Sequence, residues 1–312
     1  MSIFNKHHEH DIHTHDHINN HNHNHDHSPS ERHNHFHNTS KLKIVLSITL
    51  IYAFVEIIAA IFTKSLALGT DAVHMLTDAF ALFIAVYMAK LSQKPANNNY
   101  SYGHGRADTI GALMNALFML LIIAFIVYEG VSRFIHPVEV NGLSVTVVAS
   151  FGLIINIFSL KLLHGGDSLN TKAAFVHVLG DMLGSVSAII AGIIIYYTGF
   201  MQIDAILSIL VSLLILVPTV KILLSSVKIL MESVPDHISY ITVGEDILDI
   251  EDVISVHDLH IWTMNSSDTS LSAHVLINNI NEWDRTLINI QKMLLEKHNI
   301  HHITLQPECR SL

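Results

Sequence analysis

Two apolar segments of the chain carry the same pair of polar side chains at the same spacing. His74 and Asp78 lie four residues apart in the first segment, and His177 and Asp181 lie four residues apart in the second. Positions four apart share one face of a helix, so each segment would present an imidazole beside a carboxylate. If the two faces meet, they supply the number and type of ligands that a tetrahedral Zn²⁺ site takes.

The apolar surroundings make these charges costly unless something neutralises them. A charged side chain near the centre of a membrane helix costs roughly 2.5–3.5 kcal/mol on insertion scales. A divalent cation between two carboxylates leaves no net charge, and protons neutralise the same carboxylates when the cation leaves. Metal and proton therefore compete for one site, which is the chemical basis of an exchanger.

Other interpretations of these residues stay open. Each His–Asp pair could be a structural hydrogen bond between packed helices, but two copies near mid-depth of separate apolar spans favour the metal site. Asp71 falls on the same face as His74 but lies nearer the start of its segment. A helix-end role and a ligand role are therefore both open for Asp71.

The composition indicates an α-helical membrane protein with several spans. Of the 312 residues, 50% are hydrophobic and only 14% are charged, which is outside the usual range of soluble domains. A bilayer crossing needs about 20 mostly apolar residues. We expect six transmembrane helices, at residues 43–63, 67–90, 109–128, 143–163, 173–197 and 203–224. Lysine and arginine are concentrated on one side of these spans, which predicts that both termini are cytoplasmic.

The distribution of residue types divides the chain into three regions. Residues 1–40 hold 13 of the 25 histidines and almost no apolar residues, so we expect a disordered His-rich cytoplasmic tail. Residues 41–231 form the six-span membrane domain, and residues 232–312 form a small cytoplasmic α+β domain. Its apolar periodicity predicts the element order α-β-β-α-β and a fold of the ferredoxin-like kind. The single cysteine, Cys309, excludes an intramolecular disulfide.

Five segments carry motifs that are specific when they occur together and in this order. They are SLALGTDAVHMLTDAFAL, YSYGHGRAD, SLNTKAAFVHVLGDMLGS, SVHDLHIWTM and HHITLQPE. Over residues 41–310 the chain thereby resembles the cation diffusion facilitator family, and most of all its zinc-type branch of bacterial exporters and vesicular zinc transporters. The resemblance implies a six-span homodimer in the lipid bilayer, with cytoplasmic termini, that exchanges cytoplasmic divalent metal for protons.

The resemblance also places functional residues. The family's transport-site ligands fall on His74, Asp78, His177 and Asp181. Histidine at position 74 indicates zinc transport in this family, and imidazole favours Zn²⁺ over the hard ions Mg²⁺, Ca²⁺ and Mn²⁺. A second metal site in the cytoplasmic domain would use His257, His274, His301 and Glu308. His302 is the alternative to His301, and strand alternation would put His260 on the face opposite His257.

We therefore expect a proton-coupled antiporter that exports chiefly Zn²⁺ from the cytoplasm, with Co²⁺ and Cd²⁺ as further substrates. The short loops favour a bacterial inner membrane, and we expect no nucleic-acid partner. Zn²⁺ would also serve as a regulatory ion at the cytoplasmic site. The clustered imidazoles of the tail would capture metal for the transporter. Asp204, in the first turn of its span, would favour the helix macrodipole.

Two further classes of protein are weighed against the transporter. A membrane metalloenzyme would need several His-rich clusters at the membrane edge or an HExxH-type motif, and the sequence has neither outside its tail. We therefore expect no enzyme. The alternative function is a membrane zinc sensor without transport, but sensing alone does not explain two charged pairs buried in separate spans.

Overall fold

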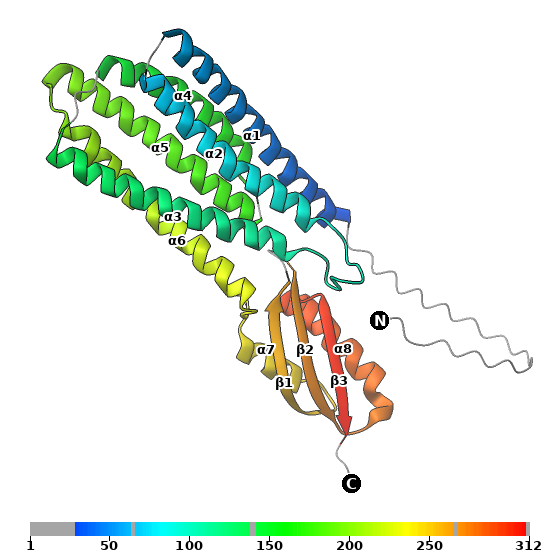
Figure 1. Cartoon of the computed structure of the whole chain (residues 1–312). Helices are drawn as coiled ribbons and strands as arrows, with labels where there is room; N and C mark the ends of the chain where they lie inside the picture. The colour runs from blue at the N-terminus through cyan, green and yellow to red at the C-terminus, as the bar shows by residue number, and fades with distance from the viewer. Residues whose placement is uncertain (1–28, 64–65, 138–141, 167, 265–267, 310–312) are drawn as a thin grey trace, which may run out of the picture.

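The computed structural model of the chain describes residues 29–63, 66–137, 142–166, 168–264 and 268–309. Six long helices form a bundle, and a small domain with a β-sheet lies beyond one end of it (Figure 1). The helices are α1 (Pro29–Thr63), α2 (Leu66–Ser92), α3 (Arg106–Ile135), α4 (Gly142–Leu163), α5 (Leu169–Thr198) and α6 (Gln202–Leu230). Helix α5 contacts each of the other five, so it is the central helix of the bundle.

Helices α2 to α6 are long and apolar enough to cross a membrane. They contain five of the six predicted spans, which makes the chain a helical membrane protein. The remaining predicted span, 43–63, lies within α1, and its crossing of the membrane stays a prediction. The expectation of disorder is wrong for residues 29–40, which extend α1 toward the N-terminus. Proline is accepted in the first turn of a helix, and helix propagation adds one hydrogen bond per residue. Residues 1–28 of the predicted tail lie outside the described residues.

Helices α4 and α5 approach each other closely through two glycines. A Cβ atom built on Gly192 of α5 would lie 2.6 Å from the carbonyl oxygen of Gly142 in α4. No side chain fits at that distance from a backbone atom, so Gly192 allows the two backbones to meet. The hydroxyl of Thr146 donates to the same carbonyl at 2.8 Å. The contact fixes α4 against the central helix.

The C-terminal domain packs two helices against one face of a three-stranded sheet (Figure 1). Its elements are α7 (Tyr240–Leu248), β1 (Val253–Thr263), β2 (Thr269–Ile277), the 3₁₀ turn η1 (Ile280–Glu282), α8 (Trp283–His298) and β3 (His302–Cys309). The middle strand, β2, runs antiparallel to β1 and parallel to β3. Val243 and Ile247 of α7 and Ile290 and Leu294 of α8 are buried against the inner face of the sheet.

The order α7-β1-β2-α8-β3 is the α-β-β-α-β order expected from the sequence. A ferredoxin-like motif has the order β-α-β-β-α-β, with a strand before the first helix. In the described part of this domain the sheet begins with β1, after α7. The domain is therefore a small α/β domain, and its ferredoxin-like character stays a prediction.

Asp246 of α7 connects the two helices of this domain. Its carboxylate accepts hydrogen bonds from Lys297 Nζ and His298 Nε2 of α8, each at 2.7 Å. The bond from Lys297, followed by the bond from His298, holds the pKa of Asp246 below its ordinary value. A carboxylate whose pKa is lowered in the folded state stabilises the fold above its unfolded pKa of about 3.9, and this contribution is lost as the pH falls through the folded pKa.

We therefore expect Asp246→Asn to lower the unfolding temperature of the C-terminal domain at pH 7 and to leave it unchanged once the pH is below the folded pKa. Both tryptophans of the chain, Trp262 and Trp283, lie in this domain, so tryptophan fluorescence of the full-length protein reports its unfolding. An equal loss at pH 7 and at strongly acidic pH would mean that Asp246 acts through packing and not through its charge.

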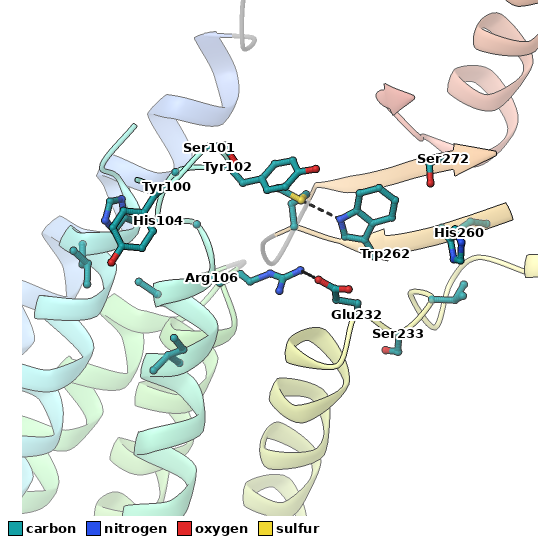
Figure 2. Close-up of a pocket in the computed structure, with 18 of the residues that line it drawn as sticks. Tyr100, Ser101, Tyr102, His104, Arg106, Glu232, Ser233, His260, Trp262 and Ser272 are labelled. Atoms are coloured by element: carbon teal, nitrogen blue, oxygen red, sulfur yellow. Dashed lines mark hydrogen bonds and ion pairs between the residues drawn. The ribbon is translucent and has the colours of Figure 1, made fainter. Parts of the chain in front are cut away.

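A cavity of about 970 Å³ lies between the bundle and the C-terminal domain. Figure 2 shows Arg106, at the start of α3, paired with Glu232, which follows α6; the two atoms Nη2 and Oε1 are 2.8 Å apart. Tyr102 and Trp262 line the same cavity from the bundle side and the sheet side. We call the end of the bundle where α3 begins and α6 ends the near end. The far end is where α3 ends and α6 begins.

Candidate metal sites

The structure brings together three of the four predicted transport-site residues. Asp78 of α2 faces His177 and Asp181 of α5, and their ligand atoms all lie within 4.8 Å of one another. His177 Nε2 is 3.3 Å from Asp78 Oδ1 and 3.9 Å from Asp181 Oδ2. The spacing of four residues places His177 and Asp181 on one face of α5, as their positions in the sequence predict.

The cluster is buried in the bundle. The exposed fractions of Asp78 and His177 are 1% and 2%, and that of the Asp181 side chain is 14%. Buried charges persist where they are paired or bind a cation. A protonated His177 would balance one of the two carboxylates, whereas a divalent cation would balance both. The donor set therefore suits a divalent cation, and its mixture of nitrogen and oxygen atoms suits Zn²⁺.

The fourth predicted ligand, His74, lies in α2 one turn before Asp78. Its side chain and that of Asp71 lie outside the described residues, so both roles stay predictions. The helix itself places position 74 on the same face as Asp78, which is the face that meets α5.

A second cavity, of about 650 Å³, leads from this cluster toward the far end of the bundle. Its lining includes Asp78, His177 and Asp181 at one end and Glu129, Arg133 and Asp204 at the other. Polar side chains continue along the wall between these groups. Asn156 of α4 donates to Ser185 Oγ at 3.4 Å, and Ser185 donates to the carbonyl of Asp181 at 2.9 Å.

The side of the cluster toward the near end is closed by packing. Asn170, whose exposed fraction is 0%, donates through Nδ2 to the carbonyl of Ala85 in α2 at 2.7 Å. Leu82, Ala174 and Val178 are buried in an apolar group around the same helices. In this conformation the cluster therefore communicates with the far end of the bundle and is closed toward the C-terminal domain.

A second cluster lies on the outer face of the C-terminal sheet. His257 of β1 and His274 of β2 are paired across the two strands, and Glu308 of β3 lies beside them. Glu308 Oε1 is 2.8 Å from His274 Nδ1, and its Oε2 is 3.2 Å from His257 Nε2. Two imidazoles and one carboxylate form a three-ligand set that leaves a fourth position for water or for another ligand. The three side chains are partly exposed, so this site exchanges with solvent.

Asp258 belongs to the same cluster and was not found by sequence reasoning. A β-bulge lies between His257 and His260, and Asp258 there has a φ of 52°. Asp258 Oδ2 is 3.7 Å from His274 Nε2, and its Oδ1 is 3.1 Å from His260 Nε2. The bulge adds a residue to β1, so His257 opposes His274 and His260 opposes Ser272. The expectation of opposite faces is therefore wrong, because His274 and Ser272 share one face of β2.

The structure separates His301 from the other predicted ligands of this site. His301 precedes β3, and its Nε2 is 3.2 Å from Asn299 Oδ1. Glu308 lies near the opposite end of the strand. Seven residues of strand correspond to about 23 Å. The alternative residue, His302, is the first residue of β3 and lies at the same end as His301. Within one protomer neither histidine can share an ion with Glu308.

The chain matches two families of cation efflux proteins. Residues 42–231 match the cation efflux transmembrane domain, and residues 235–309 match the cytoplasmic domain of cation efflux proteins.

Curated relatives are similar over most of their length. The zinc transporter ZitB of Pectobacterium atrosepticum is 39% identical over 275 residues, which cover 87% of this chain and 86% of the relative. The metal cation efflux system protein CzcD of Cupriavidus metallidurans is 37% identical over 274 residues and 87% of each chain. The cadmium, cobalt and zinc/H(+)-K(+) antiporter of Bacillus subtilis is 35% identical over 267 residues, 83% of this chain and 86% of the relative. Among solved structures, the metal-bound C-terminal domain of the CzcD transporter is 36% identical, covers 23% of this chain and 99% of its own, and has a TM-score of 0.22.

Proposed function

The chain belongs to the cation efflux family of membrane transporters, and we propose that it exports Zn²⁺ from the cytoplasm in exchange for protons. The observation that carries this proposal is the buried Asp78–His177–Asp181 cluster at the inner end of a cavity. A buried donor set that suits a divalent cation, and that opens to one end of the bundle, is what a carrier needs at the point where it releases its substrate.

Zn²⁺ would be bound by Asp78, His177 and Asp181, with His74 as the fourth ligand. When the cation leaves toward the far end, the two carboxylates lose their counter-charge within the bundle. Protons that arrive through the same cavity neutralise them and return with the empty carrier. Loading from the near end then requires α2 and α5 to separate where Asn170 now bonds to the Ala85 carbonyl.

The charges at the near end of the bundle support an orientation with this end in the cytoplasm. Lys90 lies in the last turn of α2 and Arg106 begins α3 at the near end, as the positive-inside rule expects for a cytoplasmic C-terminal domain. The far end would then face the periplasm of a bacterial inner membrane. The match to a cytoplasmic dimer domain supports a homodimer, and the names of the relatives support Cd²⁺ and Co²⁺ as further substrates.

Metal flux separates this function from that of a zinc sensor. Purified protein in sealed liposomes should accumulate Zn²⁺ in the lumen when zinc is added outside, well above protein-free liposomes. Uptake should increase when the lumen is more acidic than the medium. A correctly folded dimer that binds zinc without moving it would identify the chain as a sensor.

We further propose that the His257–His274–Glu308 cluster binds a regulatory zinc ion. Zinc that binds only the folded domain stabilises it, by about 2.7 kcal/mol at a concentration of 100 Kd. Zinc should therefore raise the unfolding temperature followed by tryptophan fluorescence by several degrees, and a His274→Ala/Glu308→Ala variant should lose this increase. The double variant His301→Ala/His302→Ala is the matched control and should keep it. Equal shifts for all three proteins would exclude the cluster as a zinc site.

The histidines of residues 1–40 would raise the local metal concentration at the cytoplasmic face. Deleting residues 1–38 should therefore weaken the apparent affinity for zinc and leave the maximal rate nearly unchanged, as measured by the initial rate of uptake over a range of zinc concentrations. A full-length variant with its 13 tail histidines replaced by asparagine should behave in the same way. Loss of the maximal rate in that variant would give the tail a direct part in transport.

A further inference from the structure

Arg133 lies at the far end of the cavity that begins at the Asp78–His177–Asp181 cluster. It belongs to the last turn of α3, fourteen residues beyond Met119, which packs near Gly180 beside the cluster. Fourteen residues of helix span about 21 Å. A cation that leaves the cluster through this cavity therefore passes Arg133 before it reaches the surface.

Two carboxylates bind Arg133 from different helices. Its Nε donates to Glu129 Oε1 at 2.9 Å, and its Nη1 lies 3.9 Å from Asp204 Oδ2 of α6. All three side chains line the cavity and are partly exposed there. Among the described residues that line it, Arg133 is the one side chain with a permanent positive charge.

Asp204 does more than interact with the end of its own helix. The first turn of α6 contains Asp204, as expected, but the residue before the helix, Met201, provides no side-chain cap. The charges of Asp204 and Arg133 each favour the dipole of their own helix. Their mutual approach inside the cavity is an additional feature, which joins α3 and α6 through charged groups on the exit route.

We infer that Arg133 keeps Glu129 and Asp204 from holding the departing zinc ion, an inference that rests on the proposed export through this cavity. Two carboxylates that meet at one cation are a binding arrangement for a divalent metal. With Arg133 between them they carry a net charge of −1, and without it they carry −2. The guanidinium occupies both carboxylates, so zinc that has left the transport site does not stop at the exit.

The test is the sensitivity of transport to zinc on the release side. Protein is reconstituted with an acidic lumen, zinc is added outside, and lumen alkalinisation is recorded with and without buffered zinc inside. Proton exit follows net turnover, so exchange of zinc for zinc does not contribute. The ratio of the two rates is independent of the active fraction of protein. In Arg133→Gln, luminal zinc should inhibit at concentrations about fivefold or more below those needed for wild type, because one unit of charge at contact distance has at least this effect in a solvated site.

Two matched variants complete the test. Arg133→Lys keeps the charge and should give the wild-type ratio of the two rates. The double variant Arg133→Gln/Glu129→Gln also removes one carboxylate, so its ratio should lie closer to that of wild type than the ratio of Arg133→Gln. If Arg133→Gln does not fold, Arg133→Met removes the same charge and keeps the aliphatic stem. Equal inhibition of wild type and the neutral variant would overturn the inference, and so would a double variant as sensitive as Arg133→Gln. Failure of the proposed function itself would differ, because wild type would then show no alkalinisation at all.

Discussion

Replacing Asp181 with asparagine should reduce gradient-driven zinc uptake by at least about a hundredfold, because it removes a ligand and a negative charge at once. Loss of a group that only orients a metal ligand already costs about 10–100-fold in affinity or activity. Asparagine keeps the shape of the side chain, so the packing of α5 should be retained. The measurement is the initial rate of zinc uptake into liposomes with an acidic lumen, divided by the amount of folded dimer.

Ser187→Ala provides the matched control for this variant. Ser187 lies on the same helix and lines the same cavity, but it is not part of the metal cluster. Its replacement should leave uptake close to that of wild type. Equal uptake by Asp181→Asn and Ser187→Ala would keep the protein a transporter and would move its metal site away from the Asp78–His177–Asp181 cluster.

Replacing His177 with aspartate should change which metal is transported. The substitution exchanges a buried imidazole, which suits Zn²⁺, for a carboxylate, which suits harder ions such as Mn²⁺. We expect zinc uptake to fall by at least about tenfold, which is the lower limit of the loss of about 10–100-fold that follows when a group supporting a metal site is replaced. Uptake of Mn²⁺ should rise relative to zinc, and competition between the two ions in one flux experiment measures that ratio.

His164→Asp is the control for the same chemical change outside the cavity. His164 follows α4 and is exposed at the near end of the bundle. The His164→Asp variant should transport Zn²⁺ and Mn²⁺ in the wild-type ratio. If His177→Asp also keeps that ratio, the imidazole does not bind the transported ion.

The part of the transport site that could be predicted is the part fixed by helix periodicity. His177 and Asp181 share a face of α5 because they are four residues apart, and this relation holds in any α-helix. The approach of Asp78 to these two residues could also be predicted, because a charged side chain in a membrane span costs free energy unless it shares a partner with the charges of another span. The distances of 3.3 and 3.9 Å follow from how α2 packs against α5, which the sequence pattern does not specify.

The C-terminal cluster was only partly predictable because strand alternation fails at a bulge. The pairing of β1 with β2 shifts between Val253 and Ser255 and again between His257 and His260, where Asp258 adds one residue to the register. That shift turns His260 to the face of His257 and brings Asp258 to His274. A positive φ at an aspartate is tolerated, yet no simple pattern in SVHDLHIW indicates it beforehand.

Which of the candidate side chains lie close together in space was the least predictable feature. His301 and Glu308 were grouped because both match the cytoplasmic metal site of the family that the chain resembles, but an extended strand holds them far apart. Asp204 was assigned to the end of its own helix because a local explanation was sufficient. Its approach to Arg133 depends on the packing of α3 against α6, and it becomes visible only in three dimensions.

The central claim, that zinc and protons exchange at one buried site, is tested most directly by recording both ions in the same liposomes. Wild-type protein is reconstituted with an acidic lumen, zinc is added outside, and zinc influx and luminal pH are followed together. We predict that zinc influx and luminal alkalinisation begin together, rise in proportion as external zinc is increased, and are both lost in Asp181→Asn. Zinc influx into the wild-type liposomes without any accompanying rise in luminal pH would contradict the exchange.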